Sequence, residues 1–297
     1  MISKELEAKV RLIQIYSDKI VRELLAGEYK SVFKGEGIEF DEVRMYQAGD
    51  EVRSIDWNVT ARTGETHVKR YIEERELNLF FLVDLSASGL FGGGEKTKNE
   101  TAAELCALLA FSAIKNNDKA GLIIFTDRVE LFIPPAKGSR HVLMMIRKLL
   151  EFEPCGRGTD ITLALDYFGH VARKASVVFL VSDFQDSGFE DTMRVLKHRH
   201  DLIAVPIIDR REISMPSVGL LELRDLETGD LMVCDTGSAR VRERFEGFSR
   251  RRLEELNVSL TEMGVDQIKI FTDEDIVNKV ALFFRARERR LTGEVMR

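Results

Sequence analysis

The chain has 297 residues, of which 44% are hydrophobic and 32% are charged, and its formal net charge is -6. This composition is typical of a globular protein with one large domain or two modest ones. The negative charge argues against a general nucleic-acid binder, because contact with phosphates needs excess positive charge.

Targeting and redox signals favour a cytoplasmic protein. No apolar run reaches the roughly 18 residues that a membrane span needs, and the longest candidate, residues 105–114, is interrupted by Ser112. The N-terminus has a charged amphipathic pattern without the apolar core of a signal peptide. Three widely spaced cysteines argue against a disulfide framework and against a cysteine-based zinc site. We therefore expect a cytoplasmic protein without a membrane span.

Residues 1–76 form an N-terminal segment that differs from the rest of the chain. Apolar positions at helical spacing from Leu6 to Leu24 predict an amphipathic helix over residues 4–26, ending before Gly27. Residues 29–76 have few long apolar runs, which indicates a loop-rich stretch with a few short strands. We expect this segment to pack on a main domain formed by residues 77–297.

The main domain alternates apolar strands with helices. Strands are predicted over residues 77–84, 119–126, 129–133, 176–181, 202–208 and 268–271. Helices are predicted over residues 97–116, 139–152, 160–173, 189–200, 238–263 and 274–288. Strands that are apolar on both faces and separated by helices imply a mostly parallel sheet covered on both sides. The predicted fold class is therefore α/β, with a doubly wound, Rossmann-like sheet.

A stretch at about residues 210–237 interrupts this alternation. The runs Leu221-Glu222-Leu223 and Leu231-Met232-Val233 flank a turn signal at residues 227–230. This pattern predicts a β-hairpin inserted at the edge of the sheet.

Oxygen-bearing side chains follow two of the predicted strands and one intervening loop. Asp84, Ser86 and Ser88 end the first strand of the main domain, Thr159 lies in a glycine-rich loop, and Asp183 follows the strand over residues 176–181. The carboxyl ends of parallel strands meet at one edge of a sheet, where ligands of such folds bind. Hard oxygen ligands without His or Cys select Mg²⁺, Mn²⁺ or Ca²⁺. The sequence therefore predicts a divalent cation site.

These five residues resemble the metal-ion-dependent adhesion site of von Willebrand A domains. The resemblance implies that Ser86, Ser88 and often Thr159 ligate the metal directly, while Asp84 and Asp183 act mainly through water. It also implies that the metal captures a carboxylate of a partner protein. The inserted hairpin is a departure from that fold, and we expect it to lie away from the metal edge.

A second resemblance covers nearly the whole chain. The runs Gly35–Phe40, Arg44–Asp50, Val52–Asn58 and Thr60–Gly64 are similar to the signature of a bacterial family known as domain of unknown function fifty-eight. That family resembles von Willebrand A proteins and is typically encoded beside MoxR-type AAA+ ATPases. The resemblance implies a non-enzymatic adaptor that serves such an ATPase and an unidentified client protein, in protein-complex maturation, metal insertion or stress response.

Polar and aromatic residues of the N-terminal segment have two interpretations. They form either a partner-binding surface or a paired polar network that locks the segment onto the main domain, since buried charges need partners. We favour the network, because Trp57 and Ile55 look like packing anchors. The residues are Arg44, Asp50, Arg53, Asp56, Trp57 and Arg62.

Three alternatives to metal-dependent docking stay open. Asp84 and the serines could simply cap the following helix. A Mg²⁺-dependent phosphohydrolase also places an aspartate at the end of its first strand, but it needs a second carboxylate two residues later, where this chain has Ser86. No lysine at a matching helix start is identified for such an enzyme. The third alternative is a scaffold in which the site is vestigial.

Overall fold

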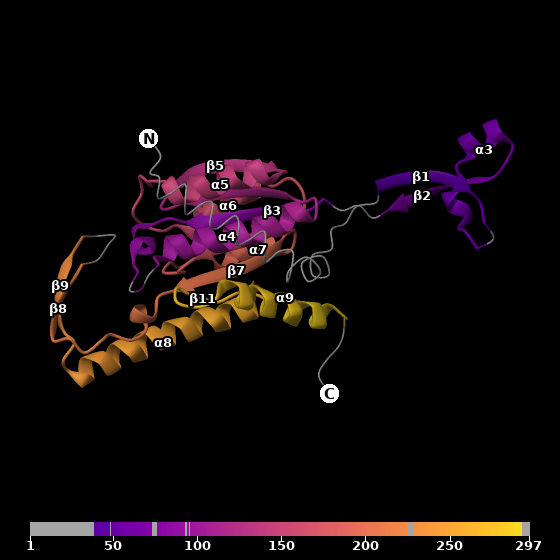
Figure 1. Ribbon diagram of the computed structural model, residues 1–297. Helices are drawn as coiled ribbons and strands as arrows, with labels where there is room; N and C mark the ends of the chain where they lie inside the picture. Colours follow the sequence, from indigo (N-terminus) through magenta and orange to yellow (C-terminus); the bar gives the residue numbers. More distant parts are fainter. Residues whose placement is uncertain are drawn as a thin grey trace. The chain divides into compact units, whose positions relative to one another are not determined.

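The computed structural model describes residues 39–47, 49–72, 76–92, 94, 96–224 and 229–292 (Figure 1). The chain divides into two compact units, of which the smaller comprises residues 33–77 and the larger includes all residues from Asn78 on. The helix predicted over residues 4–26 lies outside the described residues. In the described parts, no helix is long and apolar enough to cross a membrane.

The smaller unit contains a two-stranded antiparallel sheet and a short helix. Strands β1 (Glu39–Met45) and β2 (His67–Ile72) pair with each other, and a 3₁₀ turn, η2 (Val52–Ser54), precedes helix α3 (Trp57–Thr63). The sequence predicted the short strands but not α3, which is too short to show helical periodicity. Local signals nevertheless mark its ends, because Asp56 caps its first turn and Gly64, with φ 77°, ends it.

A seven-stranded sheet forms the centre of the larger unit. Its strands are β3 (Asn78–Asp84), β4 (Lys119–Phe125), β5 (Val129–Ala136), β6 (Val177–Ser182), β7 (Asp201–Ile208), β10 (Asp266–Gln267) and β11 (Ile270–Phe271). The order across the sheet is β10-β7-β6-β3-β4-β5, and β11 also pairs with β7. Every pair is parallel except β4 and β5, which form an antiparallel hairpin.

Helices cover both faces of this sheet. One layer contains α4 (Lys98–Lys115), α5 (Ser139–Glu151) and α9 (Ile276–Thr292), and the other contains α6 (Ile161–Val171), α7 (Glu190–Lys197) and α8 (Ala239–Glu262). The strands are apolar along their whole length because they are buried on both sides: Phe80 and Leu82 pack against α6, and Leu79 and Phe81 alternate to the opposite face. The predicted doubly wound α/β fold is confirmed.

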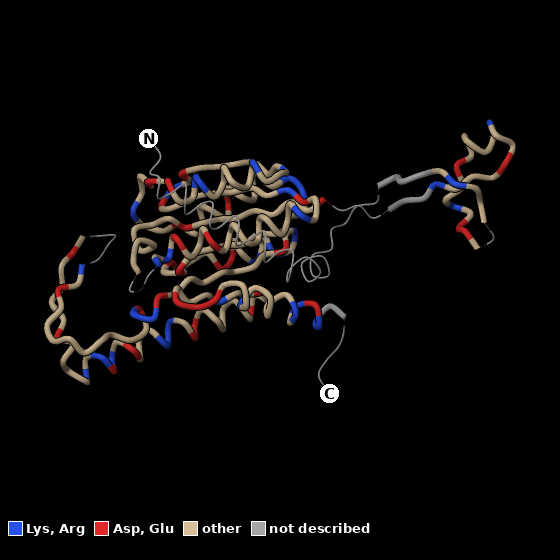
Figure 2. The backbone as a smooth tube through the Cα atoms, in the orientation of Figure 1, with Lys and Arg blue, Asp and Glu red and all other residues tan. Residues whose placement is uncertain are grey.

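Helix α8 differs from the other helices because most of its surface is solvated. Acidic and basic residues alternate along it (Figure 2), and only Ser249 and Leu260 are buried. This charge pattern explains why the helix could be predicted from its length and composition, whereas its contacts with the rest of the domain could not.

The hairpin predicted at the sheet edge exists but is not part of the main sheet. Strands β8 (Leu220–Arg224) and β9 (Leu231–Asp235) are antiparallel and, in the part of the chain described, pair only with each other. Thr236 fixes the base of the hairpin, because its backbone N–H and its hydroxyl both donate to the carbonyl of Gly219, at 2.8 and 2.7 Å. The prediction of an edge position was wrong, because in the described residues neither β8 nor β9 pairs with β5, β10 or β11, the strands at the margins of the sheet.

Candidate metal centre

The carboxyl ends of β3 and β6 form the crevice in which the predicted site lies. These strands are neighbours in register, with Val83 opposite Val181. The chain leaves β3 toward β4 on one side and leaves β6 toward β7 on the other. Such a reversal of strand order opens a crevice at the sheet edge, and Asp84 and Asp183 stand on its two sides.

Asp84 organises the hydroxyl groups around it. Its Oδ1 accepts the backbone N–H of Ser86 at 2.8 Å, and its Oδ2 accepts the hydroxyl of Ser182 at 2.7 Å. The Thr159 hydroxyl lies farther away, 3.4 Å from the same oxygen. Burial, together with the nearby carboxylate of Asp183, raises the pKa of Asp84 to about 6. Both oxygens of this carboxyl group are therefore engaged by other parts of the chain.

The two serines present their hydroxyl groups side by side. The Oγ atoms of Ser86 and Ser88 are 3.0 Å apart, on a loop that turns through the 3₁₀ element η3 (Ala87–Leu90). The N–H of Ala87 donates to the carbonyl of Arg157 at 3.0 Å, which ties this loop to the glycine-rich loop. A backbone hydrogen bond thus connects two of the three loops that were predicted to form the site.

The glycine-rich loop carries Thr159 and approaches β4 very closely. A Cβ atom at Gly156 would lie 2.2 Å from both Asp127 Oδ1 and Thr126 Oγ1, so only glycine fits. On the other side of Thr159, the N–H of Asp160 donates to the carbonyl of Thr126 at 3.0 Å, and its side chain caps α6. The position of Thr159 is therefore fixed from both sides.

Asp183 is paired with a buried lysine that sequence reasoning missed. Lys98 Nζ lies 2.7 Å from Asp183 Oδ2 and 2.6 Å from Glu212 Oε1, and its side chain is only 3% exposed. Burial alone would lower the pKa of Lys98, but Asp183 and Glu212 raise it above its ordinary value. Burial likewise opposes ionisation of Asp183, yet Lys98 holds its pKa below the usual range.

Sequence analysis identified no lysine at a helix start that matches a phosphohydrolase, but the structure places a lysine at a helix start beside the site. Lys98 is the first residue of α4 and follows the helix cap Thr97. The helix start was visible in the sequence, but the two acidic partners lie 85 and 114 residues away. No local pattern connects positions so far apart, so only the fold brings them together.

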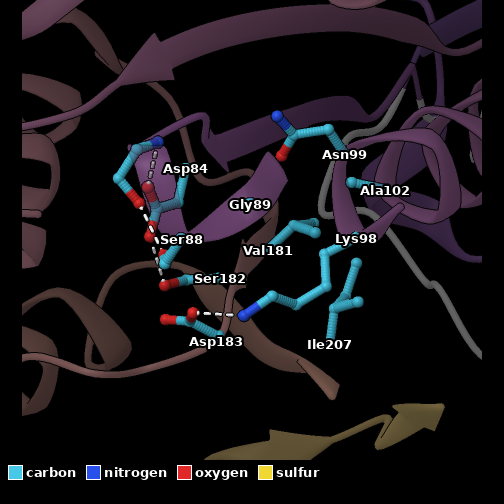
Figure 3. Close-up of a pocket in the computed structure, with 11 residues that line it drawn as sticks. Asp84, Ser88, Gly89, Lys98, Asn99, Ala102, Val181, Ser182, Asp183 and Ile207 are labelled. Carbon is cyan, nitrogen blue, oxygen red and sulfur yellow. Dashed lines mark hydrogen bonds and ion pairs between the residues drawn. The ribbon is translucent and has the colours of Figure 1, made fainter. Parts of the chain in front are cut away.

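A cavity of about 20 Å³ separates these groups and is lined by Asp84, Ser86, Ser88 and Asp183, among others. Figure 3 shows Asp84, Ser88, Ser182 and Asp183 on one side of it, and Lys98 reaching toward Asp183. This volume is about that of one water molecule or a small cation. Thr159 does not line the cavity and joins the site through Asp84. The donors are hydroxyl and carboxylate oxygens, which suit a hard divalent cation.

The candidate site depends on serine hydroxyls as well as on carboxylates. No group of three or more His, Cys, Asp or Glu side chains in those residues could hold an ion. The cysteines among them, Cys106, Cys155 and Cys234, are free.

The polar residues proposed in the N-terminal segment mostly have local structural roles. Arg44 binds both carboxylate oxygens of Asp50, at 2.8 and 2.6 Å. Asp56 caps α3, and Arg62 Nε donates to a backbone carbonyl of the same helix at 3.3 Å. By contrast, Arg53 is exposed and Trp57 is 65% exposed, so these two side chains are available for contact.

The hairpin lies beside the metal edge, contrary to the expectation that it lies away from it. Leu221 and Leu223 of β8 line a groove of about 700 Å³ whose other wall includes Ser88 and Gln185. The chain between β7 and β8, which includes the 3₁₀ turn η4 (Arg210–Glu212), runs past the Lys98 ammonium group. This path brings the hairpin to the site.

Comparison with solved structures gives weak similarities. The chain is similar to an aerotolerance-related membrane protein from Bacteroides fragilis, at 15% identity and a TM-score of 0.48, over 72% of this chain and 99% of that one. It is also similar to the SpRpn10 VWA domain, at 12% identity and a TM-score of 0.41, over 69% of this chain and 94% of that one. Values this low say nothing about what the chain binds.

Sequence comparison identifies the family. The chain is 27% identical to the uncharacterized protein Rv1480 of Mycobacterium tuberculosis over 96% of its own length and 90% of that protein. It is 32% identical to the uncharacterized protein YeaD of Bacillus subtilis over 36% of its length and 25% of that protein. The model of the family described as "Protein of unknown function DUF58" matches residues 42–255. Because this match spans well over half of the chain, the protein belongs to the DUF58 family.

Proposed function

We propose that the protein is a non-enzymatic docking module that binds Mg²⁺, or Mn²⁺ or Ca²⁺ in its place, and uses the ion to hold a carboxylate of a partner protein. The observation that carries this proposal is the small cavity in which the hydroxyls of Ser86 and Ser88 face the crevice between Asp84 and Asp183. Hydroxyl and carboxylate oxygens around an ion-sized space match the preference of hard cations.

The charges around the cavity also favour a cation. Two carboxylates, those of Asp183 and Glu212, contact the single ammonium group of Lys98, and a third, that of Asp84, lies near enough to Asp183 for the two negative charges to repel each other. An excess of negative charge at a buried site is costly without a compensating cation. Ser86 and Ser88 would ligate the ion directly, Thr159 would support the site through Asp84, and Asp84 and Asp183 would act through water. Neutral ligands leave the ion most of its charge, which it supplies to an external carboxylate.

We further propose that the partner is a MoxR-type AAA+ ATPase and that the chain presents a client protein to it. This part rests on the family resemblance alone. The exposed side chains of Trp57 and Arg53 give the smaller unit a second contact surface, through which the ATPase could be held while the metal site holds the client.

Phosphate-ester hydrolysis is the weaker alternative. Asp84 would have to act as the nucleophile, but both of its oxygens accept hydrogen bonds from the chain. Ser86 stands where a general acid is needed, and a serine hydroxyl does not supply a proton near neutral pH. Lys98 is held by two carboxylates and is not directed at a substrate phosphate.

The test is a pull-down with the full chain in Mg²⁺, repeated in EDTA and with the double variant Ser86→Ala/Ser88→Ala. Ser187→Ala is the matched control, because Ser187 is exposed on the loop that follows Asp183. Calorimetric titration with Mg²⁺ accompanies each protein. Recovery of an AAA+ ATPase or a client only with metal and intact serines supports the proposal. Equal recovery in all conditions contradicts it and directs attention to Trp57 and Arg53.

A further inference from the structure

A groove between the loop that carries Ser88 and the hairpin has no role in the proposed metal binding. It encloses about 700 Å³, a volume in the range of specific ligand pockets. Its lining is mainly apolar and comes from the first metal loop, the chain before β8, β8 itself and α8; it includes Phe91, Met215, Val218, Leu221, Leu223 and Phe248.

Several of these apolar side chains are exposed to solvent. Phe248 is 69% and Val218 is 60% exposed. Along β8, Leu221 and Leu223 are half-buried on the face that lines the groove, whereas Leu220, at 74% exposure, does not line it. Contiguous exposed apolar residues, unlike isolated ones, mark a surface on which another molecule docks.

The groove and the metal site are continuous. Ser88 lines both the small cavity and the groove. Gln185 also lines the groove and donates from its Nε2 to Asp183 Oδ2 at 3.1 Å. A ligand that reaches a cation at the serines therefore has the apolar wall immediately beside it.

The charges at the groove are mainly positive, against the negative balance of the whole chain. Arg211, Arg224 and Arg252 line it, and no carboxylate in the described residues lies within ion-pair distance of their guanidinium groups. Its one acidic residue, Glu212, is already paired with Lys98 at 2.6 Å. The electrostatic match for this surface is an acidic ligand.

We infer that the groove binds an acidic peptide segment of the partner protein, with one carboxylate at the metal site and a large apolar side chain between the hairpin and α8. The inference rests on the proposed function, because the first carboxylate needs the cation. The apolar side chain contacts Leu221, Leu223 and Phe248, and further carboxylates pair with the arginines. The metal provides a general attraction for carboxylates, and the groove selects which acidic segment binds.

The experiment is selection of random-sequence displayed peptides on the full chain in Mg²⁺, followed by fluorescence polarisation with the enriched peptides. We expect the enriched sequences to carry an Asp or Glu at a fixed spacing from a large apolar residue. Leu221→Ser and Phe248→Ala each weaken binding about tenfold, as loss of one buried anchor does. Leu220→Ser is the matched control, since Leu220 neighbours Leu221 but does not line the groove, and it leaves affinity unchanged.

The outcomes separate this inference from the proposal that it deepens. Acidic peptides without an apolar position, which bind Leu221→Ser normally but lose affinity in EDTA, overturn the groove and leave metal docking intact. Acidic-apolar peptides that bind equally in EDTA and to Ser86→Ala/Ser88→Ala contradict the metal site, and with it the placement of the first carboxylate. Enrichment of sequences from this chain's own ends would make the groove a self-docking site, and no enrichment overturns the inference.

Discussion

Lys98 and Asp183 lie 85 residues apart in the sequence, yet their Nζ and Oδ2 atoms are 2.7 Å apart with both side chains buried. The same ammonium group holds Glu212 at 2.6 Å. A single side chain at the start of α4 therefore connects the loop after β6 with the chain that leads into the hairpin.

Replacing this lysine should destabilise the fold strongly. Lys98→Met leaves two carboxylates without their cation, and loss of one partner of a buried pair costs about 3–5 kcal/mol. Urea unfolding in EDTA measures the effect. Lys96→Met is the control, because Lys96 pairs with Glu104 at 2.6 Å but is 46% exposed, and surface pairs contribute about 0–1 kcal/mol. Equal losses in both variants would mean that the buried bridge has no special role.

Binding of Mg²⁺ should raise the melting temperature of the wild-type chain. A ligand that binds only the folded state stabilises it by about 2.7 kcal/mol at a hundredfold excess over its dissociation constant. Ser86→Ala/Ser88→Ala should abolish this increase, because both hydroxyl ligands are removed. Differential scanning calorimetry with and without Mg²⁺ provides the measurement. An unchanged increase in the double variant would show that the ion binds elsewhere.

Two glycine-to-alanine substitutions should change the stability of the fold in opposite directions. Gly156→Ala places a Cβ atom 2.2 Å from Thr126 Oγ1 and Asp127 Oδ1, so it should lower stability and displace Thr159, weakening Mg²⁺ binding in calorimetry. Gly247→Ala meets nothing within 4 Å inside helix α8. It should stabilise the chain by about 0.5–1 kcal/mol, since glycine is unfavourable in a helix interior, and leave Mg²⁺ affinity unchanged.

The stability of the larger unit should fall between about pH 6.5 and pH 4 because of His200. This side chain is 4% exposed, packs on Phe168 with ring centroids 4.7 Å apart, and has no hydrogen-bond partner in the described residues for either ring nitrogen. Burial, assisted by Arg199, lowers its pKa to about 4. The unfolded chain therefore takes up the proton first as the pH falls, and folding loses up to about 3 kcal/mol.

His200→Leu removes this titration. The variant should unfold at similar denaturant concentrations across that pH range, apart from contributions of other groups, whereas the wild type becomes steadily less stable. Chemical unfolding at several pH values measures the difference. A parallel decline in both proteins would assign the acid sensitivity to the carboxylates instead.

Much of the sheet could be predicted from sequence because its strands are buried on both faces. The continuous apolar run at β3 and the similar runs at β4, β6 and β7 distinguish them from loops without further information. Of the two short strands at the far side of the sheet, β11 lies within the strand predicted over residues 268–271, whereas β10, made of the polar residues Asp266 and Gln267, was not predicted.

Candidate site residues could be selected from the sequence where they form a local motif, and they were missed where only the fold brings them together. The pattern Asp84-x-Ser86-x-Ser88 is visible in five consecutive residues, and Thr159 and Asp183 follow from the loops that end at the same edge. Lys98 and Glu212 were missed because they lie 114 residues apart, and only the fold brings them together. Ser182 was not among the predicted site residues, although its hydroxyl donates to Asp84 Oδ2 at 2.7 Å.

The separate pairing of β8 with β9 has a consequence for how partner choice can diverge. The backbone hydrogen bonds of this hairpin end within it, so substitutions, insertions or deletions there do not shift the register of the seven strands whose loops carry the candidate metal ligands. Relatives could thus exchange this hairpin for another of different length or chemistry while keeping the candidate ligands unchanged. Grafting the hairpin of one DUF58 protein onto another should accordingly transfer recognition of a partner without transferring any of the proposed ligands.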